Sequence, residues 1–204
     1  MSTAAISHLQ RDPVMARLIK EHGPLVLKPR RLSSFQSLAQ AIIHQQLRGK
    51  AAGAILGRFQ ALYPGKRFPS VNDVLETPPE TLREVGLSRA KATYLLDLAR
   101  RVKDRTVPGL KASEALPDEE LIRRLTAVKG VGRWTAEMLL IFNLGREDVL
   151  PVDDLGVRRG FQLAHGHATM PVPAELAELG KRWGPYRSIA TLYCWRAADT
   201  PGIS

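Results

Sequence analysis

Apolar residues recur at helical spacing in one segment of this chain after another. In residues 34–44 they fall three and four positions apart, as on one face of an α-helix. The same spacing returns in residues 88–103. The period-2 alternation of a half-buried strand is confined to scattered short Val and Leu runs. We therefore predict an all-α fold.

Capping residues and Pro/Gly pairs mark where the helices begin and end. Asp12 followed by Pro13 is an N-cap and first-turn pair, and Gly23-Pro24 stops that helix. Ser88 occupies the same capping position before the long helix that follows it. The other segments with helical spacing are 34–46, 49–63, 72–76, 79–86 and a helix that opens at 117–118.

Residues 125–161 are the most informative stretch. Lys129 and Gly130 end one helix, Gly130-Val131-Gly132 forms a tight turn, and Arg133 opens the next helix. Glycine adopts the left-handed backbone that a helix C-terminus often needs, and backbone amides at a helix N-terminus attract anions. Alone, this pattern is most simply interpreted as an ordinary helix–turn–helix joint.

A pair of carboxylates follows that second helix, in the sequence Pro151-Val152-Asp153-Asp154. Aspartate is a favoured N-cap, and a further apolar-periodic segment starts near Leu155. Both aspartates are therefore candidates for a helix cap, and from the residues alone that is their simplest role.

Charge indicates the kind of partner. The 204-residue chain carries 30 Lys and Arg against 20 Asp and Glu, a net charge of +10 with a pI of about 10.2. Such a balance favours a polyanionic partner without naming it. The single cysteine, Cys194, excludes an internal disulfide and a four-cysteine metal or iron–sulfur site. The five histidines have no partners at ligand spacing, so we expect no side-chain metal site.

Targeting signals are not evident. No run of about 18 apolar residues occurs, and the N-terminus lacks a charged-then-apolar signal pattern. We therefore expect a cytoplasmic protein that does not act at membranes, associated with the nucleoid if the source is bacterial.

The string from Gly130 to Asp154 resembles the helix-hairpin-helix motif followed by a Gly/Pro-rich loop and an aspartate, which marks a superfamily of DNA glycosylases. Within it, residues 130–136 are similar to the 3-methyladenine DNA glycosylase II branch, which removes alkylated purines. The similarity resumes in residues 182–188 and 192–195 and covers much of the chain more loosely.

This resemblance implies one glycosylase domain, residues 1–204, made of two helical subdomains that flank a DNA-binding cleft. A helical bundle would occupy 34–128, and 1–33 plus 129–204 would carry the hairpin and the catalytic aspartate. Some family members have an additional N-terminal β-rich domain. About 33 residues precede the helical region here, so we expect the form without that domain.

The resemblance assigns catalysis to Asp154. Cleavage of an N-glycosidic bond builds positive charge on the deoxyribose, which a nearby carboxylate stabilises while it orients or deprotonates water. Asp153 is expected to be the cap or an orienting partner. A register shift of one residue would exchange the two, and both would be simple caps if the resemblance misleads.

Aromatic residues are expected to form the base pocket. Relatives of the endonuclease III type carry, at the position of Trp134, a lysine that forms a Schiff base and cleaves the strand. Tryptophan cannot do this, so we expect a monofunctional enzyme with a face for stacking on an extruded base. Trp195 resembles a second wall, although either tryptophan could be core. Met138 replaces a frequent aromatic and Gly156 a bulkier aliphatic residue, changes that would open the pocket.

Two further groups are expected to contact DNA. Gln46, with Leu47 and Arg48 as rivals, resembles the wedge that fills the space of the extruded nucleotide; a polar helix end is the alternative. For phosphates the candidates are the hairpin residues Lys129, Gly130, Gly132 and Arg133. In the family, carbonyls of this hairpin can also hold a monovalent cation.

We therefore predict a monomeric, monofunctional DNA glycosylase that needs no cofactor. It would remove 3-methyladenine and 7-methylguanine from damaged double-stranded DNA in base excision repair and leave an abasic site. One alternative is a glycosylase for deaminated or exocyclic-adduct purines. Another is a non-catalytic helix-hairpin-helix DNA-binding module, which would need neither paired aspartates nor aromatic walls.

Overall fold

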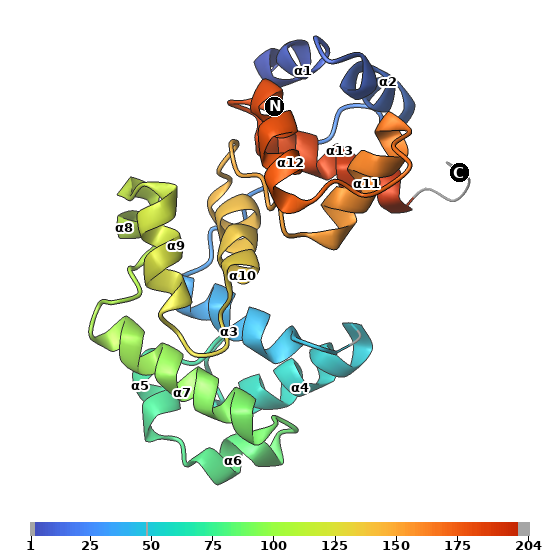
Figure 1. Ribbon diagram of the computed structural model, residues 1–204. Helices are drawn as coiled ribbons and strands as arrows, with labels where there is room; N and C mark the ends of the chain where they lie inside the picture. Colours follow the sequence, from blue (N-terminus) through green and yellow to red (C-terminus); the bar gives the residue numbers. More distant parts are fainter. Residues whose placement is uncertain (1–2, 48, 200–204) are drawn as a thin grey trace. The chain divides into compact units, whose positions relative to one another are not determined.

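The computed structural model describes residues 3–47 and 49–199, and throughout these ranges the secondary structure is helical (Figure 1). Thirteen α-helices, one π-helix and one 3₁₀ helix occur in the described part of the chain, without a β-strand. The all-α prediction is confirmed. No helix within these ranges is both long and apolar enough to cross a bilayer.

The chain forms two compact units. One, which we call the central unit, is Arg31–Leu139; the other, the terminal unit, combines Met1–Arg30 with Leu140–Ser204. The sequence predicted a division into 34–128 and 1–33 plus 129–204, which differs in where the hairpin belongs. Residues 129–139 lie in the central unit, because α10 (Arg133–Met138) packs on α9 (Asp118–Thr126).

The long helix α7 (Arg89–Lys103) organises the central unit by packing against α3 (Ser34–His44), α5 (Val71–Glu76) and α6 (Pro79–Glu84). The unit is completed by α4 (Gly49–Ala61) and α8 (Leu110–Ala115).

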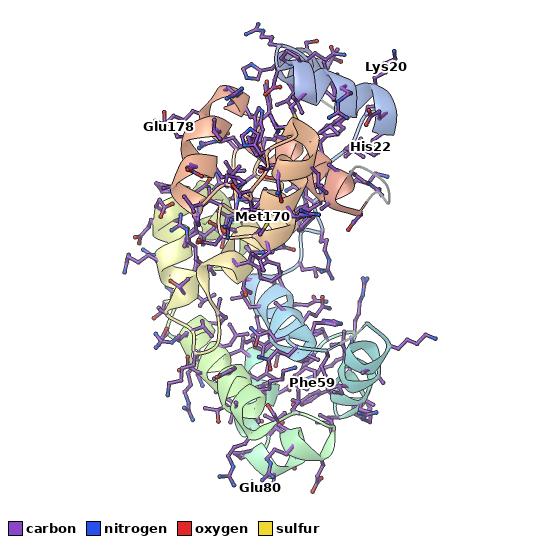
Figure 2. The ribbon with its side chains drawn as sticks, turned by 45° about the vertical axis from the view of Figure 1, so that its right-hand side comes forward. Lys20, His22, Phe59, Glu80, Met170 and Glu178 are labelled. Carbon is purple, nitrogen blue, oxygen red and sulfur yellow. The ribbon has the colours of Figure 1, made fainter. Side chains whose placement is uncertain are left out.

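Aromatic side chains fill part of the interior of this unit. Phe59 of α4 is fully buried, with its ring close to those of Tyr63 and Phe68. Glu80 at the start of α6, by contrast, projects from the outer surface (Figure 2).

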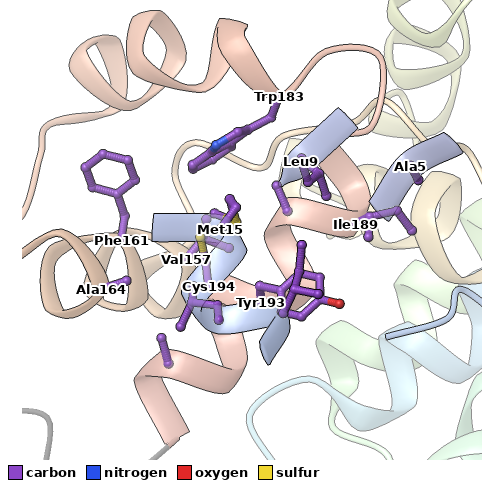
Figure 3. Close-up of a cluster of buried hydrophobic side chains, with 14 of the residues drawn as sticks. Ala5, Leu9, Met15, Val157, Phe161, Ala164, Trp183, Ile189, Tyr193 and Cys194 are labelled. Carbon is purple, nitrogen blue, oxygen red and sulfur yellow. The ribbon is translucent and has the colours of Figure 1, made fainter. Parts of the chain in front are cut away.

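The terminal unit has its own core. Its elements are α1 (Thr3–Leu9), α2 (Pro13–His22), α11 (Leu155–His165), α12 (Pro173–Leu179), the 3₁₀ helix η2 (Gly180–Trp183) and α13 (Arg187–Asp199). Helices α11 and α13 pack closely, and α2 lies against both, so the two ends of the chain share one core (Figure 3). The π-helix η1 (Leu139–Leu144) continues directly from α10.

Polar contacts tie the N-terminal helices into this core. The Trp183 indole donates a hydrogen bond of 3.1 Å to the carboxylate of Asp12, and the Tyr193 hydroxyl donates to the carbonyl of Gly23 at 2.9 Å. Cys194 is fully buried as a free thiol, and burial raises its pKa to about 12. This cysteine therefore acts as a small apolar core residue.

Most of the predicted helix starts agree with the structure. Asp12 accepts hydrogen bonds from the amides of Val14 and Met15, and Ser88 accepts one from the amide of Lys91. The short helices α1, α8 and α12 were not predicted. Each has six or seven residues and buries only one or two of them, so its periodic signal is weak.

His165, at the end of α11, occupies an unusual environment. Its ring stacks on Phe161 with centroids 3.8 Å apart, and Nδ1 lies 3.0 Å from the Phe161 carbonyl oxygen. Its Nε2 is buried and makes no hydrogen bond to the described residues. Burial lowers the pKa of this imidazole, with the charges of Asp12, His167 and Arg182 as smaller influences.

Acidification should therefore destabilise the fold through His165. The folded-state pKa lies below that of the unfolded chain, so the unfolded state binds the proton more readily. This contribution to stability is complete above the ordinary histidine pKa of about 6.5 and is lost as the pH falls below it. We expect His165→Phe, which keeps the stacked ring, to flatten the pH dependence of the unfolding free energy between neutral and mildly acidic pH. Chemical denaturation at several pH values measures this, and an unchanged slope in the variant contradicts it.

Candidate functional site

Asp154 is the N-cap of α11, and its carboxylate is held in place. The oxygen Oδ1 accepts hydrogen bonds from the Val157 amide at 2.8 Å and from the Trp195 indole N–H at 3.0 Å. The side chain is half-buried. Because the two donors come from α11 and α13, two helices of one packed core fix the orientation of this carboxylate.

Trp195 is itself fixed by a second aromatic ring. It stacks on Phe142 with ring centroids 5.7 Å apart and an interplanar angle of 19°. Gly156 leaves room for it, since a β-carbon there would lie 3.0 Å from Cδ1 of Trp195 and 3.1 Å from Oδ1 of Asp154. Gly156 was predicted to open the pocket, but the Trp195 ring and the Asp154 carboxylate occupy the space beside it.

The helix-capping role predicted for Asp153 is wrong. Helix α11 begins at Leu155, so Asp154 is the N-cap and its carboxylate satisfies the amide three residues on. Asp153 is exposed. The Asp154 carboxylate therefore both caps a helix and stands in the partly open position that chemistry would require.

In the central unit, several predicted residues surround one open cavity, which we call the hairpin cavity. Trp134, Gln46 and Gly130 line it together with residues that the sequence analysis did not assign to the site. Those residues are Gln45, Ser88, Ala90, Lys91 and Tyr94. Trp134 is 50% exposed, so this tryptophan is not a core residue. Trp183, which is 0% exposed, shows what a core tryptophan of this chain looks like.

The hairpin itself depends on Gly130. Its φ is +78°, and a β-carbon there would overlap the ring of Tyr94. The backbone amides of Gly130 and Gly132 make no hydrogen bond within the described residues, whereas the amide of Lys129 donates to Asp97 at 2.9 Å. Two hairpin amides are thus available to an anion, and the exposed side chain of Lys129 stands beside them.

The turn that follows α3 is bonded to this hairpin. The Gln45 side-chain amide donates to the carbonyl of Gly130 at 2.7 Å. Lys91 donates from Nζ to the carbonyls of Ile43 and Gln45 at 2.8 and 2.6 Å, and burial lowers its pKa. Because the Gly130 carbonyl already accepts the Gln45 amide, it is a poorer ligand for a cation. Binding of a monovalent cation by the hairpin carbonyls stays a prediction.

Arg133 does not offer its guanidinium to a phosphate in this structure. It forms a bidentate pair with Glu119, and its Nε donates to the buried carboxylate of Glu137 at 3.0 Å. These two carboxylates raise the pKa of Arg133, so the guanidinium stays protonated. Their negative charges offset its positive charge. This pair could not be predicted from the sequence, because Glu119 lies 14 positions from Arg133, beyond the range of a helical charge pattern.

Two predicted site residues, Met138 and Leu47, do not line the hairpin cavity. Met138 ends α10 half-buried. Leu47 is 37% exposed beside Gln46, and Arg48 lies outside the described residues. Among the described residues no group of three or more His, Cys, Asp or Glu side chains could hold a metal ion.

The additional residues had weak sequence signals. Tyr94, Lys91 and Gln45 stand on α7 and the end of α3, where helical periodicity marks the buried face and says little about the other positions. The short Gly86 turn before α7 resembles a degenerate copy of the hairpin, and it places Lys91 one turn into α7.

Comparison with known proteins identifies the family. Residues 39–185 match the model described as "HhH-GPD superfamily base excision DNA repair protein". DNA-3-methyladenine glycosylase 1 of Schizosaccharomyces pombe is 37% identical over 164 residues, which is 80% of this chain and 72% of that protein.

Solved structures agree with this. The S. pombe 3-methyladenine DNA glycosylase Mag1, in complex with abasic DNA, superposes with a TM-score of 0.82 at 36% identity, covering 95% of this chain and 96% of that one. A DNA-3-methyladenine glycosidase from Bacillus halodurans gives a TM-score of 0.89 at 34% identity and covers 98% and 91%.

The two hairpin glycines should differ sharply in what they tolerate. Gly130→Ala should destabilise the protein by about 2–4 kcal/mol, because left-handed backbone costs alanine about 1–2 kcal/mol and overlap with Tyr94 adds to it. Gly132→Ala is the matched control: its φ is −90° and a β-carbon there meets nothing within 4 Å. Denaturant unfolding measures both variants. Equal losses at the two positions would contradict this account of the hairpin.

Proposed function

The chain belongs to the HhH-GPD superfamily of base excision DNA repair proteins, and on that premise we propose that it is a DNA glycosylase for alkylated purines. It hydrolyses the N-glycosidic bond of bases such as 3-methyladenine and 7-methylguanine in double-stranded DNA. The observation that carries this proposal is the half-buried Asp154 carboxylate, held by two N–H donors at the start of α11. Its relatives named DNA-3-methyladenine glycosylases support the choice of substrate.

Asp154 acts on the sugar. As the bond from the sugar carbon to the base nitrogen lengthens, its electron pair leaves with the base and the deoxyribose becomes cationic. The carboxylate stabilises that charge and accepts the proton of the attacking water, whose oxygen forms the new bond to the sugar carbon. An alkylated purine already carries positive charge, so its departure needs little protonation. The products are the free base and an abasic site.

Trp195 orients this carboxylate. Its indole N–H is bonded to Oδ1, and its ring is stacked on Phe142. We therefore propose two roles for Trp195. Its ring forms the predicted second aromatic wall beside Asp154, and its indole N–H donates a hydrogen bond that holds the carboxylate.

Trp134 offers an exposed aromatic face at the hairpin cavity of the central unit. A flat, electron-rich ring suits stacking on an extruded cationic base. Since a tryptophan stands where the bifunctional relatives carry the Schiff-base lysine, the proposed reaction ends at hydrolysis and leaves the strand intact.

DNA is gripped by the central unit. Of the 30 basic residues 18 lie in residues 31–139, together with 11 of the 20 acidic ones, so this part of the sequence has a net charge of +7. The amides of Gly130 and Gly132 and the side chain of Lys129 are the proposed phosphate contacts. Gln46 is the proposed wedge, with Leu47 next to it.

Replacing the reactive carboxylate tests the proposal. Asp154→Asn should slow base release by about 10²–10⁴-fold, the usual contribution of a general base. Asparagine is as good an N-cap as aspartate, so α11 and the fold should persist. DNA affinity should stay within a few-fold, because the phosphate contacts lie elsewhere. Single-turnover release of 7-methylguanine from a duplex, with a binding titration alongside, measures both.

Asp153→Asn is the matched control, since Asp153 is exposed and does not cap the helix. It should retain base release. An inactive Asp153→Asn beside an active Asp154→Asn would show that the catalytic assignment is shifted by one residue.

A further inference from the structure

The turn after α3 has a backbone that its residues do not favour. Gln45 has φ −51° and ψ 134°, Gln46 has φ +56°, and the Leu47 amide donates to the His44 carbonyl at 3.2 Å. This is a type II turn with Gln46 at the position where glycine is normally required. A glutamine pays a conformational cost there, so other contacts must hold the turn in this shape.

Lys91 supplies those contacts from the other side. Its ammonium donates to the carbonyls of Ile43 and Gln45, one on each side of the last residue of α3. A cation is also favourably placed at a helix C-terminus, where the backbone carbonyls lack helical partners. The Gln45 side chain then bonds the same turn to the Gly130 carbonyl. Three segments of the central unit are therefore joined at the proposed wedge.

We propose that Lys91 is a positioning residue for base extrusion: it locks the Gln45–Gln46 turn so that the Gln46 side chain meets the duplex already ordered. This rests on the proposed glycosylase function. A preformed wedge loses no conformational entropy on binding, so more of the binding free energy is available to separate the damaged base from its partner. Lys91 acts through Gln46 and takes no part in bond cleavage.

A direct phosphate contact is the competing role for a lysine in a DNA-binding unit. The geometry speaks against it, because Nζ already donates two short hydrogen bonds to main-chain carbonyls and the group is half-buried. Burial also lowers its pKa, because the ammonium is partly removed from water. Lys129, whose side chain is exposed, is the lysine suited to a phosphate.

The test compares paired and unpaired substrates. Lys91→Met keeps the length of the side chain and removes its donors. Single-turnover base release is measured on a duplex with 7-methylguanine opposite cytosine, and on the same duplex with an abasic-site analogue opposite the lesion. Because extrusion costs most for a paired base, we expect about 10-fold slower release from the first substrate and a change within about twofold on the second.

Two control variants separate the alternatives. Lys129→Met should weaken the binding of both substrates equally and make the slope of log K against log salt concentration shallower by about one unit. Lys91→Met should leave that slope unchanged. Gln46→Gly relieves the turn and removes the wedge, so adding Lys91→Met to it should cause no further loss on the paired substrate. Multiplying losses in that double variant, or a shallower slope in Lys91→Met, overturns the proposal.

Hydrogen exchange at the Leu47 amide tests the role of Lys91 without substrate, so it applies even where base release cannot be measured. In Lys91→Met, hydrogen exchange at the Leu47 amide should accelerate, because the turn that shields it loosens; in Lys129→Met it should not. Equal exchange in Lys91→Met and the wild type overturns the role of Lys91 even if the variant is too unstable for kinetics. A wild type that releases no base from either duplex overturns the proposed function, and the role of Lys91 with it. An active wild type with an equally active Lys91→Met overturns only the role of Lys91.

Discussion

The chemistry proposed for this protein depends on one oxygen atom, Oδ1 of Asp154, which accepts N–H groups from Val157 and Trp195. The first bond is the N-terminal cap of α11 and the second comes from α13. A cap is needed wherever a helix starts inside a folded protein, since the first amides have no helical partner. Here the residue that meets this need is also the proposed catalytic group, so the packing of α11 on α13 sets the direction of the carboxylate.

In the central unit, too, the same residues have structural and proposed functional roles. Gly130 has the left-handed backbone of the hairpin and lies against Tyr94, its carbonyl accepts the Gln45 amide, and Lys91 binds the turn that contains Gln45. The phosphate-binding hairpin and the wedge are thus parts of one bonded cluster. Both units build their functional residues onto helix ends, where backbone groups are unsatisfied and side chains are held by capping bonds.

Local signals predicted much of this arrangement. Asp12 and Ser88 were recognised as caps because a cap depends on residues two or three positions away. The Gly130 turn was recognised for the same reason. The resemblance to a glycosylase family supplied Asp154 and Trp134, which periodicity alone would have left as a cap and a core residue.

Interactions between distant segments could not be predicted in this way. The Trp195 bond to Asp154 spans 41 positions, the Lys91 bond to Gln45 spans 46, and Arg133 is neutralised by Glu119 from another helix. None of these leaves a trace in spacing or composition. The misplaced cap, predicted at Asp153 and found at Asp154, has a simpler cause, since a cap is defined by the first helical residue and the sequence left that boundary uncertain by one position.

The central claim is that this chain hydrolyses the N-glycosidic bond of alkylated purines. The most direct test is to incubate the protein with methylated duplex DNA and identify every base released, together with the state of the strand. We predict free 3-methyladenine and 7-methylguanine, and an intact strand with abasic sites. Intact binding to the damaged duplex with no base released would contradict the claim and identify a DNA-binding module instead.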